Sequence, residues 1–455
     1  MVVVGVLCRG VLAFRFFRSL GRLGFCSKPT NQPINQADKT AALAEGVGRH
    51  QLGAGLKGGG EKLAHLVRAT AEARPTDVWV ALDLSNAFGT MLREPALAEA
   101  AQVVPELVDY LGMFLLRDTR YRLVRVSGEA VWMRAGEGAE QGDVWGPVLY
   151  SLALRPCVAR LEEDLRQHLR NRGWSEDAAA EAVGVSAYLD DLVIRVPPVL
   201  TAEVVPAARV ALEPMGGRLN ASKCHAWSPG TAEPPGLPPG FWQENGLRLL
   251  GTPHGEGLSR GEDAPLPVGQ TAVSGHLEKT LASYRAFLAR LEQVVRDAPP
   301  KDPRVQSAVL LLRLCGQGKA THLLRTLPPA LTRRFAEDLD ATTEETLESL
   351  CRLDALTGDQ RRQLRLPLRA GGLGLRAQAS LRGVAYLGSW LGNLKGVRER
   401  CPPGVASAET FRAGERAWVR ALKDAQGSLA ADGVHLTEQG DVVDVLLQTP
   451  WNWDE

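Results

Sequence analysis

Residues 185–196 read Val-Ser-Ala-Tyr-Leu-Asp-Asp-Leu-Val-Ile-Arg-Val, so two adjacent acids, Asp190 and Asp191, lie between two apolar runs. Apolar runs that flank a short polar break are typical of a tight β-hairpin. A second apolar run, residues 77–83 (Asp-Val-Trp-Val-Ala-Leu-Asp), reads as a buried strand that ends at Asp83. The sequence therefore predicts carboxylates at strand ends in two distant parts of the chain.

These acids are the strongest candidates for chemistry. Two unpaired carboxylates about 4 Å apart repel by about 4 kcal/mol at an effective dielectric constant of about 20. Such a cluster persists if one acid is protonated or if a cation binds between them. Oxygen ligands without a nearby His or Cys favour Mg²⁺ or Mn²⁺ over zinc. The alternative is structural, with Asp83 as a helix N-cap and Asp190-Asp191 as an exposed turn.

The rest of the chain separates into a mixed region and a helical region. Residues 93–117 and 147–169 have helical patterns, and residues 120–133 suggest a second hairpin. From Thr271 onward the pattern is mostly helical, whereas residues 401–455 have weak periodicity and are expected to form a poorly anchored tail. This order predicts an α+β domain followed by an α domain.

Composition limits the protein class. Of the 455 residues, 45% are hydrophobic and 23% charged, which is ordinary globular usage and excludes wholesale disorder. No run of about 18 apolar residues exists, so no membrane-spanning helix is expected. The 7 Cys include no C-x-x-C pair, which argues against a disulfide framework or a structural zinc site and fits a reducing, intracellular compartment.

The net charge of +1 hides a local basic bias. Residues 360–397 contain no acid, while arginines recur throughout this stretch. One interpretation is a solvated basic face. The other is contact with the phosphates of a nucleic acid, made by residues that include Arg361, Arg362, Arg365 and Arg369.

The sequence segments around the acids resemble reverse transcriptase motifs, and these motifs occur along the chain in the same order as in that family. Motif A is matched by Asp83-Leu-Ser-Asn-Ala-Phe88, and motif C by Ala187-Tyr-Leu-Asp-Asp191. Motifs B, D and E are matched by residues 140–154, 217–224 and 249–252. Residues 366–375 resemble a stretch downstream of the polymerase core in non-LTR (LINE-type) retrotransposon proteins, so the resemblance covers about residues 46–395.

This resemblance implies a right-hand polymerase of α+β class. Residues 46–270 would form a truncated fingers remnant and a palm, which is an antiparallel sheet with flanking helices. Residues 271–400 would form a helical thumb and downstream region, and residues 401–455 a C-terminal tail. Residues 1–45 are an unassigned leader, expected to be partly disordered.

The implied activity is RNA-directed DNA synthesis from an RNA template, a DNA primer and deoxynucleoside triphosphates. Two Mg²⁺ or Mn²⁺ ions would be held by Asp83, Asp190, Asp191 and the carbonyl of Leu84. Lys223 would protonate the departing pyrophosphate or screen its charge; its alternative is a surface lysine after an Asn turn. The arginines named above would lie against the duplex backbone.

Three further residues are implied to contact the nucleotide. Phe88 would pack under the incoming sugar and exclude a 2′-hydroxyl, although without the flanking motif it reads as a core aromatic. Gln141 and Gly142 would approach the templating base pair, where glycine permits a close backbone approach.

The chain also departs from the family pattern. Val144-Trp145 stands where the family usually has Pro-Leu, and a bulky Trp beside the nucleotide could distort the site. The fingers motifs expected before Gln51, and any nuclease domain, are not recognisable. The sequence thus favours a truncated copy, and the alternative to an active polymerase is a catalytically inactive relic that at most binds nucleic acid.

Overall fold

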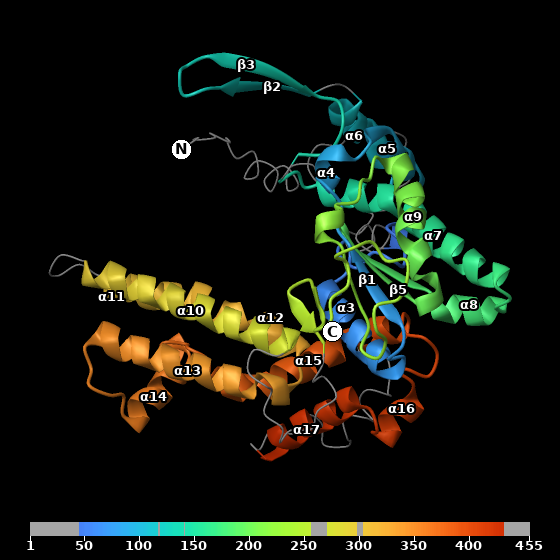
Figure 1. Ribbon diagram of the computed structural model, residues 1–455. Coiled ribbons are helices and arrows are strands. Elements are labelled where there is room, and N and C mark those ends of the chain that lie inside the picture. The colour runs from blue at the N-terminus through green and yellow to red at the C-terminus, as the bar shows by residue number, and fades with distance from the viewer. Residues whose placement is uncertain (1–44, 117–118, 141, 256–270, 298–303, 432–455) are drawn as a thin grey trace, which may run out of the picture.

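The centre of the molecule is a four-stranded antiparallel sheet in the order β4-β5-β1-β6 (Figure 1). The computed structural model describes residues 45–116, 119–140, 142–255, 271–297 and 304–431. The bounds of the sheet strands are β1 Val78–Leu82, β4 Gly184–Tyr188, β5 Asp191–Val196 and β6 His225–Trp227. The mixed fold with a small antiparallel sheet, predicted from the sequence, is confirmed.

Strand β1 is apolar throughout because both faces of the sheet are covered. Val78, Val80 and Leu82 join a core with helices on one side of the sheet, whereas Trp79 faces a second core on the other side. The first face is covered by α5 Arg93–Val103, α7 Gly146–Asn171 and α9 Thr201–Leu212; the second is covered by α3 Gly59–Ala73. Shorter helices complete this region: α4 Ala87–Thr90, α6 Val108–Leu115 and α8 Glu176–Ala182.

Two further hairpins stand outside the main sheet. The first, β2 Thr119–Val124 with β3 Ala130–Ala135, confirms the hairpin predicted over residues 120–133 and projects from the body (Figure 1). The second, β7 Leu247–Leu249 with β8 Thr252–His254, contains the residues matched to motif E.

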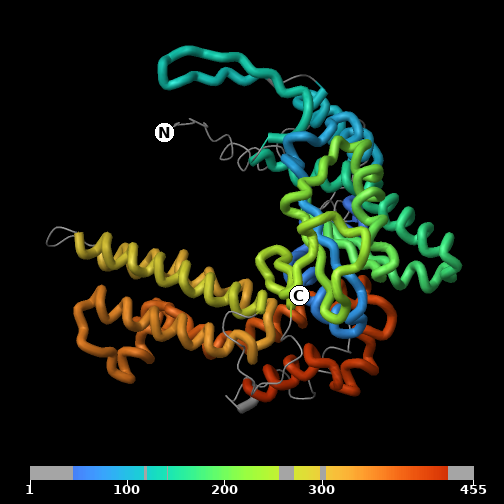
Figure 2. Tube along the Cα trace, viewed as in Figure 1, coloured from blue at the N-terminus to red at the C-terminus, as the bar shows by residue number. Residues whose placement is uncertain are grey.

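The later part of the chain is helical, as predicted, and has its own apolar core. The helices α10 and α13 pack along each other and extend away from the sheet (Figure 2). The bounds are α10 Ala272–Arg296, α11 Arg304–Leu311, α12 Gly318–Thr326, α13 Pro329–Cys351, α14 Gly358–Arg365 and α15 Gln378–Arg398, with a π-helical turn over Leu312–Gly316. Within the described residues no helix is long and apolar enough to cross a membrane.

The expectation of a poorly anchored tail is wrong for residues 401–431. Helices α16 Ala408–Ala413 and α17 Ala417–Ala431 pack into a core with α15 and α3. Trp418 is 1% exposed and stacks on Trp390, with ring centroids 4.6 Å apart. Trp418, Leu422 and Ala425 of α17 are buried at helical spacing, so one face of this helix joins the core. The remaining tail, residues 432–455, and the leader, residues 1–44, lie outside the described residues.

Candidate active site at the edge of the sheet

The β4–β5 hairpin carries Asp190 in a two-residue turn and Asp191 as the first residue of β5. Tyr188 pairs directly with Asp191, so Leu189 and Asp190 form the turn itself. Leu189 adopts a φ of 55°, in the left-handed region that costs a non-glycine residue about 1–2 kcal/mol. Its backbone N–H donates to Gln51 Oε1 at 2.8 Å, and its carbonyl accepts from Gln51 Nε2 at 3.4 Å. Gln51 thus fixes the turn that presents the acids.

Sequence reasoning did not identify this role of Gln51, because its partner lies 138 residues away. The side chain is only 2% exposed, and its amide oxygen also accepts from the N–H of Gly53. A Cβ at Gly53 would lie 2.7 Å from the Leu189 nitrogen, so glycine is required for the close approach. An amide followed two residues later by glycine is too common a pattern to have revealed the contact.

Asp83 follows β1 and lies next to the loop over residues 220–224, which precedes β6. Its carbonyl accepts from the N–H of Asn220 at 2.8 Å, and its own N–H donates to Cys224 Sγ at 3.4 Å. The Lys223 ammonium lies 3.9 Å from Asp83 Oδ2. The alternative of Asp83 as a helix N-cap is wrong, because Asn86 occupies the N-cap of the next helix.

The three carboxylates influence one another electrostatically. Burial raises the pKa of Asp191 to about 6, and the negative charges of Asp190 and Asp83 add to this effect. Burial also raises the pKa of Asp190, with a further contribution from Asp83, while Lys223 opposes both shifts. Leu82 of β1 pairs with Leu192 of β5, so Asp83 and Asp191 from two distant segments lie at neighbouring strand ends, and the Lys223 ammonium lies beside Asp83. The alternative of a simple solvated turn does not account for the effect of the Asp83 charge on both acids of the hairpin.

An open groove of about 650 Å³ begins at these acids and continues toward the helical part of the chain. Asp83, Asp191 and Lys223 line one end of the groove. Arg248 of β7 and Lys279 of α10 line it further along. The groove therefore joins an acidic end to a basic wall.

The carboxylate oxygens of Asp83, Asp190 and Asp191 are of the type that binds a hard cation such as Mg²⁺, but the three acids do not form a ready-made ligand cluster. Carboxylate oxygens are the ligands that Mg²⁺ prefers, and the negative charge of Asp83 helps to raise the pKa of both Asp190 and Asp191. However, the described residues contain no group of three or more His, Cys, Asp or Glu side chains that could hold a metal ion together. The acids are neighbours rather than a closed ligand cluster.

The residues predicted to contact a nucleotide have different surroundings. Phe88 is half-buried and packs on Tyr150 of α7, with ring centroids 4.8 Å apart. Burial raises the pKa of the Tyr150 hydroxyl, and the charge of Asp190 adds to this effect. Leu84 is buried and forms a bridge with Leu219.

The motif B loop is only partly described. Gly142 is exposed, with a φ of 93° that favours glycine, and Gln141 lies outside the described residues. Trp145 is half-buried against the core at the start of α7, while Val144 is 62% exposed.

The Lys223 side chain is 67% exposed, as a surface lysine would be, and its ammonium also lies beside the Asp83 carboxylate, where it could act on a leaving group.

The β7–β8 hairpin, which was matched to motif E, is held by the helical region. Thr252 Oγ1 lies 2.9 Å from His322 Nε2, and Thr326 Oγ1 accepts from Thr252 at 3.2 Å, so α12 holds this hairpin.

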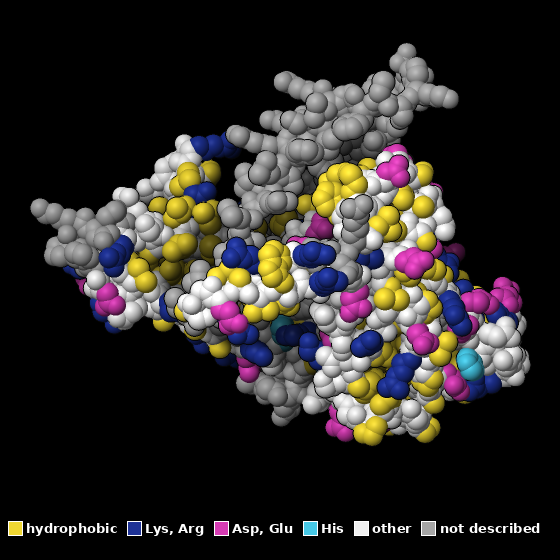
Figure 3. All heavy atoms as spheres, turned by 90° about the horizontal axis from the view of Figure 1, so that it is seen from above, with side chains coloured by type: hydrophobic (Ala, Val, Ile, Leu, Met, Phe, Trp, Pro, Cys, Tyr) yellow, Lys and Arg dark blue, Asp and Glu magenta, His cyan; other side chains and the backbone are white. Residues whose placement is uncertain are grey.

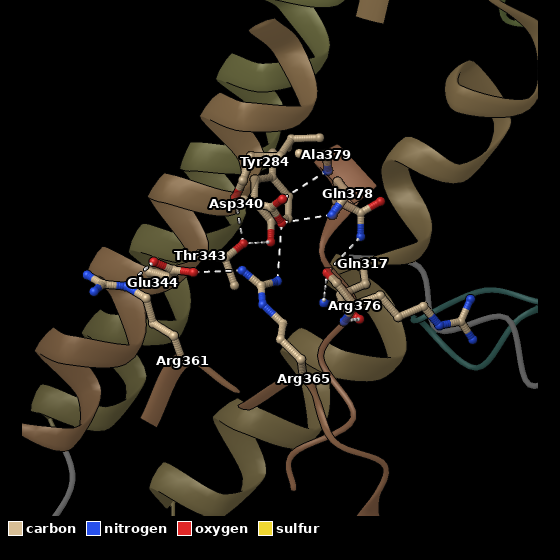
Figure 4. A network of polar contacts seen from close by, with 11 residues as sticks. Tyr284, Gln317, Asp340, Thr343, Glu344, Arg361, Arg365, Arg376, Gln378 and Ala379 are labelled. Carbon is tan, nitrogen blue, oxygen red and sulfur yellow. Dashed lines mark hydrogen bonds and ion pairs between the residues drawn. The ribbon is translucent and has the colours of Figure 1, made fainter. Parts of the chain in front are cut away.

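Three of the four arginines predicted to contact nucleic acid form ion pairs within the protein (Figure 4). Arg361 bonds Glu344 at 2.9 Å, and Arg365 bonds both Glu344 at 2.6 Å and Asp340 at 3.3 Å. Arg362 pairs with Asp359. Arg369 is exposed and makes no ion pair or hydrogen bond with its side chain among the described residues. Acids of α13 and α14 thus offset part of the local basic bias.

Fold and site together define a mixed helix-and-sheet protein with an acidic site on a small antiparallel sheet. In sequence, the chain is similar to the Retrotransposable element SLACS 132 kDa protein of Trypanosoma brucei gambiense, with 25% identity over 325 residues, 66% of this chain and 24% of that protein. The predicted resemblance to a non-LTR retrotransposon protein is confirmed, and the chain spans about a quarter of that relative's length. No protein-family model matches the chain.

Among solved structures, the chain is similar to two yeast telomerases. Apo telomerase from Candida tropicalis shares 10% identity, covers 90% of this chain and 59% of its own, and has a TM-score of 0.36. Telomerase from Candida albicans with the TWJ fragment of telomeric RNA shares 10% identity, covers 78% of this chain and 55% of its own, and has a TM-score of 0.31. TM-scores this low do not establish a shared fold.

Proposed function

We propose that the protein is an RNA-directed DNA polymerase that adds deoxynucleotides to a primer 3′ end. The observation that carries the proposal is that Asp83 and Asp191, at neighbouring ends of β1 and β5, line one groove, with Lys223 beside Asp83. The similarity to a retrotransposon protein supports it. In this proposal the four-stranded sheet with its helices is the palm, and helices α10 to α14 form the thumb.

The chain's own residues would bind and orient the substrates. The acids would receive a triphosphate through divalent ions, which supply charge neutralisation and activate the primer hydroxyl when bound. Lys223 lies where its ammonium could donate a proton or positive charge to a leaving pyrophosphate. Arg248 and Lys279 would follow the primer–template along the groove. Phe88, supported by Tyr150, would contact the sugar.

The test is primer extension on a primed RNA, with and without Mg²⁺ or Mn²⁺. Asp190→Ala is expected to reduce extension by at least about a thousandfold, because it removes charge that must be matched in the transition state. Asp177→Ala, an exposed acid in the first turn of α8, is the matched control and should leave the rate unchanged. Primer extension by Asp190→Ala at the rate of the unaltered protein would contradict the proposed polymerase mechanism.

A second candidate is a non-catalytic protein that binds nucleic acid. The observation that favours it is the absence of a three-acid ligand cluster from the described part of the chain. It predicts salt-dependent binding of a primer–template duplex with no nucleotide addition. Extension that remains undetectable after Val144→Pro and Trp145→Leu, with duplex binding intact, would favour this candidate.

A further inference from the structure

The β2–β3 hairpin has two chemically distinct faces. Cross-strand pairs share a face, and neighbouring positions alternate between faces. Arg120 pairs with Arg134, and Arg122 pairs with Trp132, so three arginines and one tryptophan occupy the same face. The opposite face is apolar and carries Tyr121, Leu123, Val131 and Met133. We refer to the first as the Arg/Trp face.

The Arg/Trp face carries uncompensated positive charge. Arg120, Arg122 and Arg134 are exposed and make no ion pair or hydrogen bond with their side chains among the described residues. Like charges directly across a strand pair destabilise it, and an isolated two-stranded hairpin is marginal in water. The pairing of Arg120 with Arg134 therefore has a cost that a bound polyanion would remove.

Trp132 indicates what kind of polyanion fits. Its ring is 67% exposed and lies across the ribbon from Arg122. A flat aromatic surface between cationic groups stacks on unpaired bases, whereas the bases of a duplex are already stacked on each other. A face with one aromatic ring and three arginines thus matches single-stranded nucleic acid better than a duplex.

The hairpin is held in a defined place relative to the candidate site. Tyr121 Oη donates to Glu140, in the motif B loop that precedes α7, so the base of the ribbon contacts this loop. The ribbon and the helices α10 and α11 project toward the same side of the molecule (Figure 1). Seen from above, the surface on this side carries exposed hydrophobic side chains together with a few Lys and Arg side chains (Figure 3).

We propose that the Arg/Trp face of the β2–β3 hairpin binds single-stranded nucleic acid, with Trp132 stacked on a base and Arg120, Arg122 and Arg134 on phosphates. If the proposed polymerase function holds, the bound strand is the unpaired template; the binding itself does not require the acids. The ribbon would thereby grip a strand before it reaches the groove.

The experiment measures binding of a fluorescein-labelled oligo(U) of about 16 nucleotides to the full chain by anisotropy at several salt concentrations. The triple variant Arg120→Gln, Arg122→Gln, Arg134→Gln should lower the slope of log affinity against log salt by about 2, at about 0.7 for each phosphate that is no longer neutralised. Trp132→Ala should weaken binding by about tenfold without changing that slope, and Trp132→Phe should restore most of the affinity.

Two controls separate binding from folding. Arg134→Glu creates an opposite-charge pair with Arg120, which stabilises the ribbon, yet it should weaken oligo(U) binding more than Arg134→Gln does. Met133→Gln, on the apolar face, and Arg160→Gln, on α7 beside Asp164, should bind like the unaltered protein.

The outcomes distinguish this inference from the proposed function. Unchanged binding by both the triple variant and Trp132→Ala overturns the inference, even if primers are extended. Tighter binding of a duplex of the same length, with no effect of Trp132→Ala, overturns the single-strand assignment. Binding that depends on the hairpin residues in a protein that extends no primer supports the inference and contradicts the polymerase function.

Discussion

At the scale of single residues, the position of the acids depends on a turn that is held by one buried amide. Leu189 occupies a left-handed conformation, and Gln51 bonds both its N–H and its carbonyl. The acids beside it repel each other, so the turn would otherwise relax. The sequence predicted that the acids lie at strand ends, because apolar runs flank them. It did not predict the contact between Gln51 and Leu189, because residues 138 positions apart leave no local pattern.

Replacing Gln51 should therefore lower activity without removing any group that contacts the substrate. Gln51→Ala leaves the N–H and carbonyl of Leu189 without these partners, which costs about 1–3 kcal/mol. We expect about tenfold slower extension, mostly in kcat, with a lower melting temperature. Gln167→Ala, an exposed glutamine on α7, serves as the control.

A second substitution tests whether strain is the cause. Leu189→Gly and Leu189→Ala both remove a side chain that packs on the core, but only glycine adopts the left-handed conformation without steric cost, so in the Gln51→Ala protein Leu189→Gly should be the more stable of the two. The measurement is a double-mutant cycle from denaturant unfolding. Strictly additive effects of Gln51→Ala and Leu189→Gly would contradict the link between them.

At the scale of elements, ion pairs decide what the basic segment does. Arg361 and Arg365 join α14 to α13, and Asp340 also accepts from the backbone N–H groups of Gln378 and Ala379 at the start of α15 (Figure 4). The sequence predicted the arginines and the helices but not this network, since the acids lie 17–25 residues away on α13.

Arg365 and Arg369 should therefore behave differently when changed. Arg365→Gln should destabilise the protein by about 1.5–3 kcal/mol, because it breaks charge-assisted bonds to Asp340 and Glu344, and it should leave the salt dependence of duplex binding unchanged. Arg369→Gln should leave stability unchanged; a reduced salt slope for this variant would assign it a phosphate contact. Denaturant unfolding measures the stability of the two variants, and salt titrations measure their duplex binding. A stable Arg365→Gln protein with a reduced salt slope would contradict the assignment of Arg365 to folding.

Helix α3 is tied to the later helices by a carboxylate with a shifted pKa. Burial alone would raise the pKa of Glu61, but hydrogen bonds from Arg325 and Ser389 and the charge of Arg325 outweigh it and hold the pKa below the ordinary 4.5. A lowered pKa means that the ionised form stabilises the fold above pH 4.5, and that this stability is lost as pH falls through the folded-state pKa.

The pH dependence of stability follows from the lowered pKa of Glu61. The difference in unfolding free energy between the unaltered protein and Glu61→Gln should be constant near neutral pH and shrink below pH 4.5. Urea melts across that range measure it. Glu233→Gln, an exposed carboxylate with no ion pair or hydrogen bond among the described residues, should show no such change.

At the scale of the whole molecule, the C-terminal helices are part of the structure. Trp418 is buried between Trp390 and Phe411, with centroid distances of 4.6 and 5.0 Å. Strands and long helices were predictable because their apolar residues repeat with the period of the element. The docking of α17 was missed although Trp418, Leu422 and Ala425 repeat at helical spacing, because no local pattern shows which helices cover that face.

Trp418→Ala should therefore destabilise the protein by about 3–5 kcal/mol through the cavity it leaves. Trp174→Ala removes a ring that is 39% exposed and provides the control. Thermal unfolding measures both variants. An equal, small effect for the two would show that residues 401–431 do not share the core.

Helix α3 precedes the sheet in the chain, yet its side chains lie among the helices of the other end. Arg68 donates to the Thr326 carbonyl, His65 Nε2 lies 2.8 Å from Ser389 Oγ, and Glu61 bonds Arg325. A polypeptide cut once between residues 255 and 271 would consequently elute from a sizing column as a single particle. Separate expression of either fragment would yield insoluble protein, each lacking surfaces that only the other supplies.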